Sequence, residues 1–120
     1  MTTTTKTFEI ERHGQLPLRF RGEVIADVTS KEYDDQERWQ EVWIYRTESG
    51  RWVTETLGCT IVPGEITFRH VAVCDTPSEV RESLYRKVHN KRHFSKYAIA
   101  ALEDAAEQDR ELTEALYEPV

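Results

Sequence analysis

The chain has 120 residues and a mass of 14.1 kDa, enough for one hydrophobic core, so we predict a single domain over residues 1–120. Charged residues make up 32% of it, the net charge is -6, and no stretch approaches the roughly 20 apolar residues of a membrane helix, which argues against a helical membrane protein. Residues 1–6 lack the apolar core of a secretory signal and the two cysteines are not closely spaced, so we expect a cytoplasmic protein with reduced thiols.

The first third of the chain contains two candidate strands. Residues 1–6 are expected to be disordered, and Thr7 to His13 forms a candidate strand. Leu16 to Val28 alternates apolar and charged side chains, the period of a half-buried strand, and Gly22 marks an expected bulge or bend. Residues 29–37 are polar and acidic and predict a loop.

Two hairpins are predicted next. Residues 38–47 and 51–62 are rich in strand-forming residues and flank Glu48-Ser49-Gly50, in which glycine occupies the left-handed position of a three-residue loop. Pro63-Gly64 then turns the chain into a further strand over residues 66–74.

The loop lengths predict which residues face one another. In the first hairpin Trp43 lies opposite Glu55, and in the second Cys59 lies opposite Phe68. One face of the sheet then collects an apolar set that we expect helices to cover. This set consists of Trp43, Tyr45, Val53, Leu57, Cys59, Ile66, Phe68, Ala72 and Cys74.

The opposite face combines polar residues with an apolar patch around Trp52, which Arg46 faces across the hairpin. Tryptophan and arginine dominate binding hot spots, and an exposed apolar patch marks a protein partner or a second copy in a homodimer. A further element, the N-terminal strand or the acidic tail, is the alternative cover for this patch. The candidate protein interface consists of Val42, Ile44, Arg46, Trp52, Val71 and Val73.

Two helices are predicted in the last third of the chain. Residues 76–79, Thr-Pro-Ser-Glu, form a capping box with proline at the first helical position, and we expect this helix to fray near Asn90. Ser95 caps the second helix. Residues 109–120 are expected to form an acidic tail that is either mobile or stabilised by docking or by the basic segment. The fold class is therefore α+β, an antiparallel sheet of four to five strands with one face covered by two C-terminal helices.

Positive charge is concentrated in residues 86–96, which carry five cations and no acid. One interpretation is a solvated helix end that the acidic tail partly neutralises. The other is a phosphate-binding segment that recognises a nucleic acid. Its candidate phosphate-binding residues are Arg86, Lys87, Lys91, Arg92 and Lys96.

No motif supports catalysis, since the chain has no glycine-rich phosphate loop, no Gly-x-Ser-x-Gly and no Cys-x-x-Cys. His89 and His93 have the helical spacing of two metal ligands, but no third ligand is evident. Cys59 and His70 lie diagonally on the predicted inner face, where a buried thiol beside a core histidine is the favoured interpretation over a nucleophile pair. We therefore predict no catalytic residue, no metal, no cofactor and no enzyme.

Four short motifs carry a family resemblance: Phe20-x-Gly22, Ile25-Ala26, the hairpin sequence of residues 45–51, and Glu79-Val80 at a helix start. Over residues 18–106 the chain resembles the EXLDI family of small bacterial proteins. It departs from the family in lacking the helical N-terminal segment of many members and the Glu-x-Leu-Asp-Ile ending. The family has no established activity, so the resemblance implies only a bacterial or mobile-element accessory protein.

These observations favour a small cytoplasmic protein-binding or regulatory protein, an inhibitor or accessory factor that acts through a sheet-face interface. The alternative is a nucleic-acid or phosphate-binding module that uses residues 86–96.

Overall fold

The computed structural model describes residues 5–120, apart from the side chains of Lys87 and Val88. Residues 1–4 of the segment expected to be disordered lie outside the described residues, and β1 begins at Lys6. The elements in chain order are β1 (Lys6–Arg12), β2 (Gln15–Thr29), β3 (Arg38–Thr47), β4 (Trp52–Thr60), β5 (Phe68–Cys74), α1 (Pro77–Ser83), β6 (Arg86–Val88), β7 (Lys91–His93), α2 (Lys96–Gln108) and the 3₁₀ helix η1 (Arg110–Leu116).

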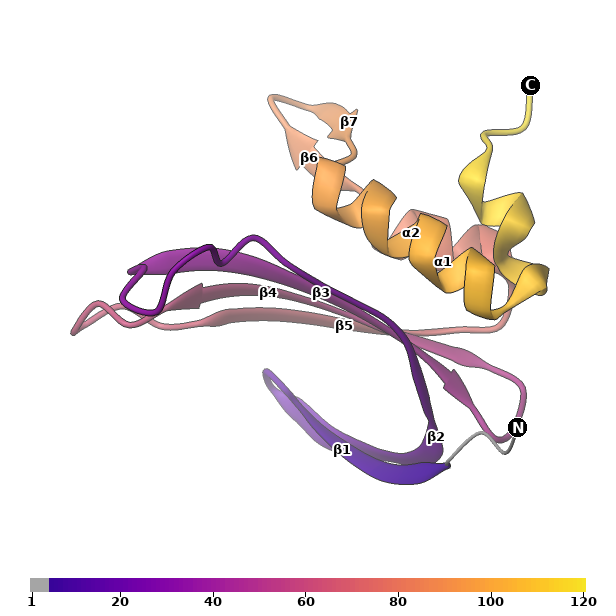
Figure 1. The fold of residues 1–120 in the computed structure, drawn as a ribbon, viewed down its shortest axis with the longest axis horizontal. Coiled ribbons are helices and arrows are strands. Elements are labelled where there is room, and N and C mark those ends of the chain that lie inside the picture. The colour runs from indigo at the N-terminus through magenta and orange to yellow at the C-terminus, as the bar shows by residue number, and fades with distance from the viewer. Residues whose placement is uncertain (1–4) are drawn as a thin grey trace.

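Strands β1 to β5 form one antiparallel sheet in sequence order, which confirms the predicted meander and the α+β class. The sheet curls into a half-barrel, with β1 and the first part of β2 bent beneath the other strands (Figure 1). The helices lie on the opposite, convex side. β1 and β5 are the two edge strands of this sheet and do not pair with each other. They approach at an open seam, where Arg69 Nη1 of β5 lies 4.0 Å from Glu11 Oε2 of β1.

Gly22 lies at the bend of β2, where it pairs with Thr47 of β3. A Cβ atom at this position would lie 2.3 Å from the carbonyl oxygen of Arg46, so only glycine permits this approach of the two backbones. The pairing of β2 with β3 shifts register between Val24 and Ala26, and such a bulge increases strand bending. The bend predicted at Gly22 therefore belongs to the curvature that makes the half-barrel.

The predicted register of the first hairpin is confirmed, because Trp43 pairs with Glu55. The predicted register of the second hairpin is wrong by one residue, since Phe68 pairs with Gly58 rather than with Cys59. The connection is longer than a tight turn and spans residues 61–67, so it does not impose the expected pairing. A slip of one residue exchanges the two faces of β5.

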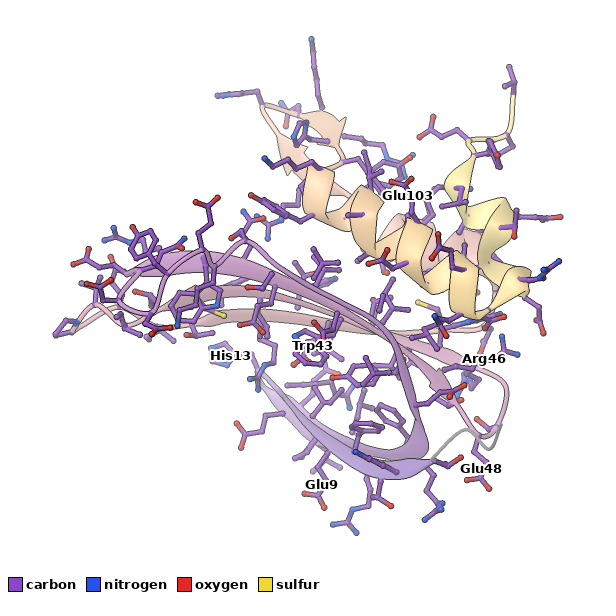
Figure 2. All side chains as sticks on the ribbon, in the orientation of Figure 1. Glu9, His13, Trp43, Arg46, Glu48 and Glu103 are labelled. Carbon is purple, nitrogen blue, oxygen red and sulfur yellow. The ribbon has the colours of Figure 1, made fainter. Side chains whose placement is uncertain are left out.

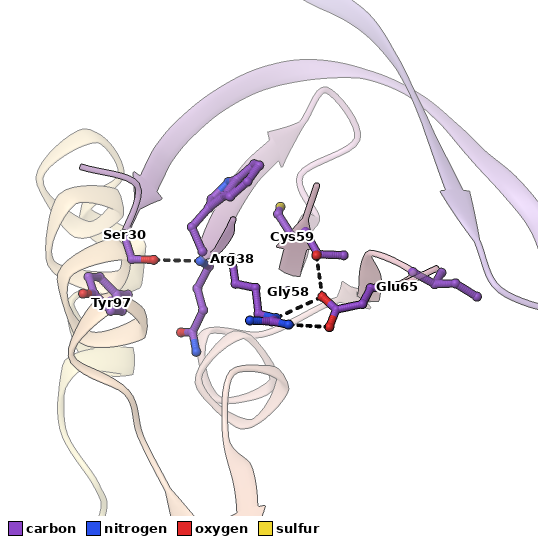
Figure 3. A pocket seen from close by; sticks show the side chains of 10 residues that line it. Ser30, Arg38, Gly58, Cys59, Glu65 and Tyr97 are labelled. Carbon is purple, nitrogen blue, oxygen red and sulfur yellow. Dashed lines mark hydrogen bonds and ion pairs between the residues drawn. The ribbon is translucent and has the colours of Figure 1, made fainter. Parts of the chain in front are cut away.

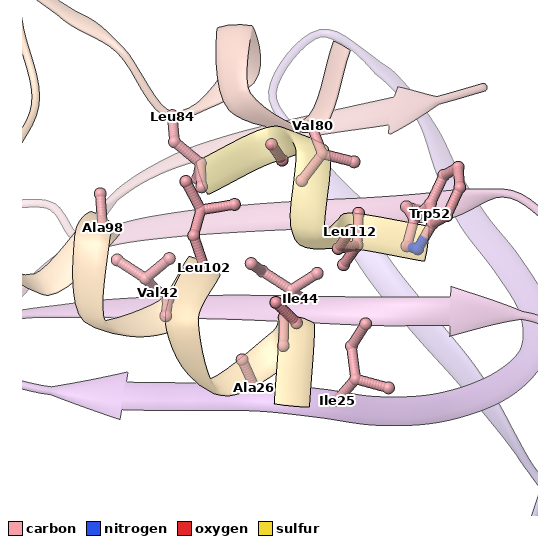
Figure 4. Close-up of a cluster of buried hydrophobic side chains, with 14 of the residues drawn as sticks. Ile25, Ala26, Val42, Ile44, Trp52, Val80, Leu84, Ala98, Leu102 and Leu112 are labelled. Atoms are coloured by element: carbon pink, nitrogen blue, oxygen red, sulfur yellow. The ribbon is translucent and has the colours of Figure 1, made fainter. Parts of the chain in front are cut away.

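The main core lies between the convex face of the sheet and the helices (Figure 4). Val42 and Ile44 of β3 and Trp52 of β4 are at most 2% exposed there. They pack with Val80 of α1, Leu102 of α2 and other small and aliphatic side chains. The face covered by helices is thus the one that carries Trp52.

The predicted set of helix-covered residues is therefore wrong, except for Ala72 and Cys74 of β5, which pack in the core beneath the helices. Trp43 and Tyr45 lie on the concave side, where β1 and β2 cover part of them. Phe68 is 66% exposed and Ile66 is 80% exposed, so neither belongs to the core. Both faces of β3 are apolar because both are covered, one by helices and one by the bent hairpin of β1 and β2.

Both predicted helix caps are confirmed. Thr76 accepts a hydrogen bond from the backbone of Glu79 at 3.1 Å, and Ser95 accepts one from Ala98 at 3.1 Å. Helix α1 ends at Ser83, however, rather than near Asn90. The expected last turns are replaced by a hairpin of β6 and β7.

The segment after α2 docks onto the sheet, which is one of the arrangements expected for the acidic tail. Asp109 Oδ2 accepts hydrogen bonds from Arg46 Nη1 at 2.7 Å and from the Trp52 indole at 3.0 Å. The Arg46 guanidinium lies 4.1 Å from the Trp52 ring centroid, and Leu112 of η1 is fully buried. Within the described residues, no helix is long and apolar enough to cross a membrane.

Candidate functional site

The concave face of the half-barrel has an aromatic centre. Tyr45 of β3 packs against Phe8 of β1 at 5.0 Å and Phe20 of β2 at 5.4 Å between ring centroids. Ile10 and Val53 are buried with Tyr45 in this second cluster. The aromatic cluster fills the middle of the concavity and leaves a groove on either side of it.

One groove, of about 480 Å³, opens beside Trp43. Trp43 stacks nearly parallel to Tyr45, with 6.3 Å between ring centroids, and faces the space between the sheet and β1 (Figure 2). We call this space the acidic groove, because three glutamates and one arginine line it, namely Glu11, Glu41, Glu55 and Arg69. Glu9 also borders it, but its side chain points away from the concave face and pairs with Arg19 at 2.7 Å (Figure 2).

Glu41 is a carboxylate held by three donors on the concave face. Its Oε1 accepts from the Trp43 indole at 3.0 Å, and its Oε2 accepts from the Trp39 indole at 2.7 Å and from the Cys59 thiol at 3.6 Å. Burial alone raises the pKa of Glu41, but these hydrogen bonds outweigh it, so the pKa lies below its usual value. Glu41 therefore stays negatively charged while it orients two tryptophan side chains.

Glu55 is the most buried of the groove carboxylates, at 7% exposure. Tyr45 donates its hydroxyl to Glu55 Oε1 at 3.3 Å, and Arg69 Nε lies 3.1 Å from Oε2, an ion pair that is not aligned as a hydrogen bond. Burial raises the pKa of Glu55, and the Arg69 charge and the Tyr45 hydroxyl only partly oppose this. Burial also raises the pKa of the Tyr45 hydroxyl, with Glu55 adding to it.

The second groove, of about 640 Å³, lies on the other side of the aromatic cluster and is lined by Val53, which pairs with Tyr45. Its floor is apolar and includes Leu18, Val53 and Val73, the last of which is 39% exposed. Its rim carries ion pairs, such as Arg21 with Glu48 at 3.1 Å. We call it the apolar groove. The concave face thus offers an acidic groove and an apolar groove, with the aromatic cluster between them.

The structure contradicts the expected exposure of the predicted protein interface. Val42, Ile44 and Trp52 are core residues under α1, α2 and η1. Val71 and Val73 lie on the concave side instead, because the slipped register of β5 exchanges its faces. The alternative cover, the acidic tail, is the one that the structure shows, and Arg46 pairs with Asp109 of that segment.

The predicted phosphate-binding residues lie on the β6–β7 hairpin and at the start of α2. Arg86, Lys91, Arg92 and Lys96 are exposed, and Lys87 pairs with Arg92 by its backbone. Arg92 forms an ion pair with Glu82, and its guanidinium lies 3.9 Å from the Tyr85 ring centroid. The structure therefore keeps these cations together, on a hairpin rather than a helix.

A third cleft, of about 660 Å³, lies at the end of the sheet beside the start of α2 (Figure 3). Arg38 binds Glu65 through two hydrogen bonds of 2.9 and 2.6 Å, and the Thr60 hydroxyl donates to the same carboxylate at 2.6 Å. Ser30 accepts from the Gln40 backbone at 2.7 Å. These polar groups form hydrogen bonds with one another at the ends of the strands, so we assign them a structural role.

The structure separates the weaker catalytic candidates. His70 pairs with Thr56, three residues from Cys59, so Cys59 and His70 lie on opposite faces of the sheet. Burial, with Glu41 adding to it, raises the pKa of Cys59 to about 11, which opposes a nucleophilic thiolate. His89 and His93 lie on a hairpin, without helical spacing, and the described part of the chain contains no group of three metal-ligating side chains.

Sequence reasoning missed the two groove carboxylates. Glu41 and Glu55 alternate with Trp43 and Leu57 on strands whose other residues on that face, apart from Thr47, are apolar or aromatic. A charged residue inside an apolar face is the signal that could have identified them, since a buried carboxylate needs partners.

No protein-family model, no curated protein and no solved structure matches this chain. The resemblance to the EXLDI family consequently stays a prediction.

Proposed function

We propose that this chain is a small binding protein that takes a cationic segment of a protein partner into the concave face of the half-barrel. The observation that carries the proposal is the buried carboxylate of Glu55 in a groove that three glutamates and one arginine line. A charge in a shielded groove acts more strongly on a ligand than one on an open surface. The ligand that complements this lining is a lysine or arginine side chain.

Aromatic side chains add to this preference. Trp43 is half-buried at the groove, and the face of an indole ring attracts ammonium and guanidinium groups. The net charge of -6 also attracts a cationic partner from a distance.

The arrangement of the two grooves favours an extended segment over a single cation. The acidic and apolar grooves lie on either side of the aromatic cluster, so an extended chain that crosses the cluster can place a cation in one groove and an apolar side chain in the other. Among the described strands β5 is an edge strand at the seam, and an extended peptide binds such an edge through its backbone.

The same proposal includes a regulatory role. A small protein that covers a basic segment acts on its partner as an inhibitor or accessory factor, without catalysis of its own. We place it in the cytoplasm, in keeping with the free thiols of Cys59 and Cys74, and the EXLDI resemblance favours a bacterial or mobile-element origin. A homodimer through Trp52 is not part of the proposal, since Trp52 is buried.

The test is a binding titration with a ten-residue peptide that alternates arginine with valine. Its counterpart carries glutamate in place of arginine. We expect the full chain to bind the cationic peptide only. The Glu55→Gln variant should bind it about tenfold more weakly, a loss of about 1.4 kcal/mol, because it removes a shielded charge and keeps the side-chain shape.

Two further variants make this test specific. Glu103→Gln removes the same charge from the exposed side of α2, away from the groove, and should leave the affinity unchanged (Figure 2). Glu11→Gln removes an exposed groove charge at little risk to folding and should weaken binding. Equal losses in the Glu103 and groove variants, or no binding to the cationic peptide, would contradict the proposal.

A further inference from the structure

The β6–β7 hairpin is a second candidate site, separate from the groove. It projects from the body above α2 (Figure 1). Its tip is a two-residue turn, in which His89 and Asn90 adopt positive φ angles of 52° and 64°, the geometry of a tight hairpin turn. The base is anchored by Tyr85 and Phe94, whose rings pack edge to face at 4.6 Å.

The cations on this hairpin differ from those elsewhere in the protein. Among the described cationic side chains of residues 86–96, only Arg92 lies within 4.0 Å of a carboxylate. Most arginines outside this segment are neutralised by a neighbouring acid. Those arginines are Arg19, Arg21, Arg38, Arg46, Arg51, Arg69 and Arg81.

The hairpin pairing decides which cations face solvent. Arg86 pairs with His93 and Val88 with Lys91, so Arg86, Lys91 and His93 extend from one face of the hairpin. Arg92 extends from the other face, toward Glu82 of α1. Arg86 and Lys91 are exposed, and Lys96 follows at the start of α2. The outward face therefore carries positive charge, and residues 86–96 contain no acidic residue that would neutralise it.

We infer that this outward face binds the phosphate backbone of a duplex nucleic acid. A two-stranded β ribbon fits the major groove of DNA, and cations flanking it neutralise phosphates. An anionic membrane is less favoured, because Val88 is the only apolar residue of residues 86–93, whereas membrane-binding segments insert several apolar side chains. The negative charge of the rest of the protein makes this binding weak and strongly dependent on salt.

The test measures binding of the full chain to a fluorescein-labelled 20-base-pair DNA duplex by anisotropy, from 20 to 200 mM salt. Contacts of Arg86, Lys91 and Lys96 with about three phosphates predict that log K falls with log salt at a slope of about -2.7. The double variant Arg86→Ala/Lys91→Ala should reduce the slope by about 2 and weaken binding at least tenfold at 20 mM salt.

The matched control is Lys6→Ala/Arg110→Ala, which removes the same charge from exposed positions outside the hairpin. It should retain a slope close to that of the unchanged protein. The inference is overturned if the duplex does not bind at 20 mM salt, or if both double variants lose affinity equally. Binding to vesicles that contain phosphatidylserine, in the absence of DNA binding, would overturn it in favour of a membrane contact.

Discussion

At the scale of single residues, Trp52 and Phe68 show how burial determines the role of an aromatic side chain. Trp52 is 2% exposed, contacts the helix core and donates its indole to Asp109. Phe68 begins β5 on the same side of the sheet but is 66% exposed. The helices do not cover its end of the strand.

Alanine substitutions of these two residues should therefore differ in their effect on stability. Trp52→Ala should lower the free energy of unfolding by about 3 to 5 kcal/mol, the usual loss for a buried aromatic residue. Phe68→Ala should cost less than about 1 kcal/mol, since most of its surface stays in water when the chain folds. Urea denaturation of both variants measures the difference, and the reverse order would mean that the helices cover the other face.

The groove carboxylates also illustrate what residue-level reasoning can reach. The pairing of Trp43 with Glu55 follows from the three-residue loop, so the position of Glu55 beside a tryptophan was predictable. Its burial was not, because it depends on β1 and β2 bending over the same face.

At the scale of elements, short loops allowed correct prediction and long connections did not. The loop of residues 48–50 gave the correct pairing of β3 with β4, whereas residues 61–67 allowed a one-residue slip of β5. The β6–β7 hairpin was mistaken for helix, because Val80, Leu84 and Val88 share a helical period although the chain turns at His89 and Asn90. Periodicity alone does not show where a helix ends.

The bend of β2 is the element-level feature that creates the concave face, and Gly22 permits it. Gly22→Ala should lower the free energy of unfolding by about 2 to 3 kcal/mol, because its Cβ would lie 2.3 Å from the Arg46 carbonyl oxygen and the backbone must move. Thermal or urea unfolding measures this loss.

Gly58 provides the matched control, as a second glycine inside a strand. A Cβ there would meet the Phe68 Cβ at 3.7 Å, an ordinary contact, so Gly58→Ala should change stability by less than about 1 kcal/mol. Equal effects of the two substitutions would show that the approach of β2 to β3 is not tight.

At the scale of the whole molecule, the sheet separates two apolar layers with different roles. The convex layer is closed by α1, α2 and η1, and its polar contacts are internal, as between Arg46 and Asp109. The concave layer is only partly filled and carries the groove carboxylates. The alternation of apolar residues on both faces was visible in the sequence, but which layer is closed depends on long-range packing that local patterns do not encode.

The three tryptophans report on these layers separately, which allows a direct test of the central claim that the concave face is the binding surface. The Trp39 and Trp43 indoles donate to Glu41 on the concave side, and the Trp52 indole donates to Asp109 on the helix side. The measurement is a ¹⁵N–¹H NMR titration of the full chain with the arginine–valine peptide, with the indole signals assigned by tryptophan-to-phenylalanine variants. We predict that the Trp43 and Trp39 indole signals shift and saturate with the peptide while the Trp52 signal stays in place. A shift of Trp52 alone, or no shift of Trp43 at saturation, would contradict the assignment of the concave face.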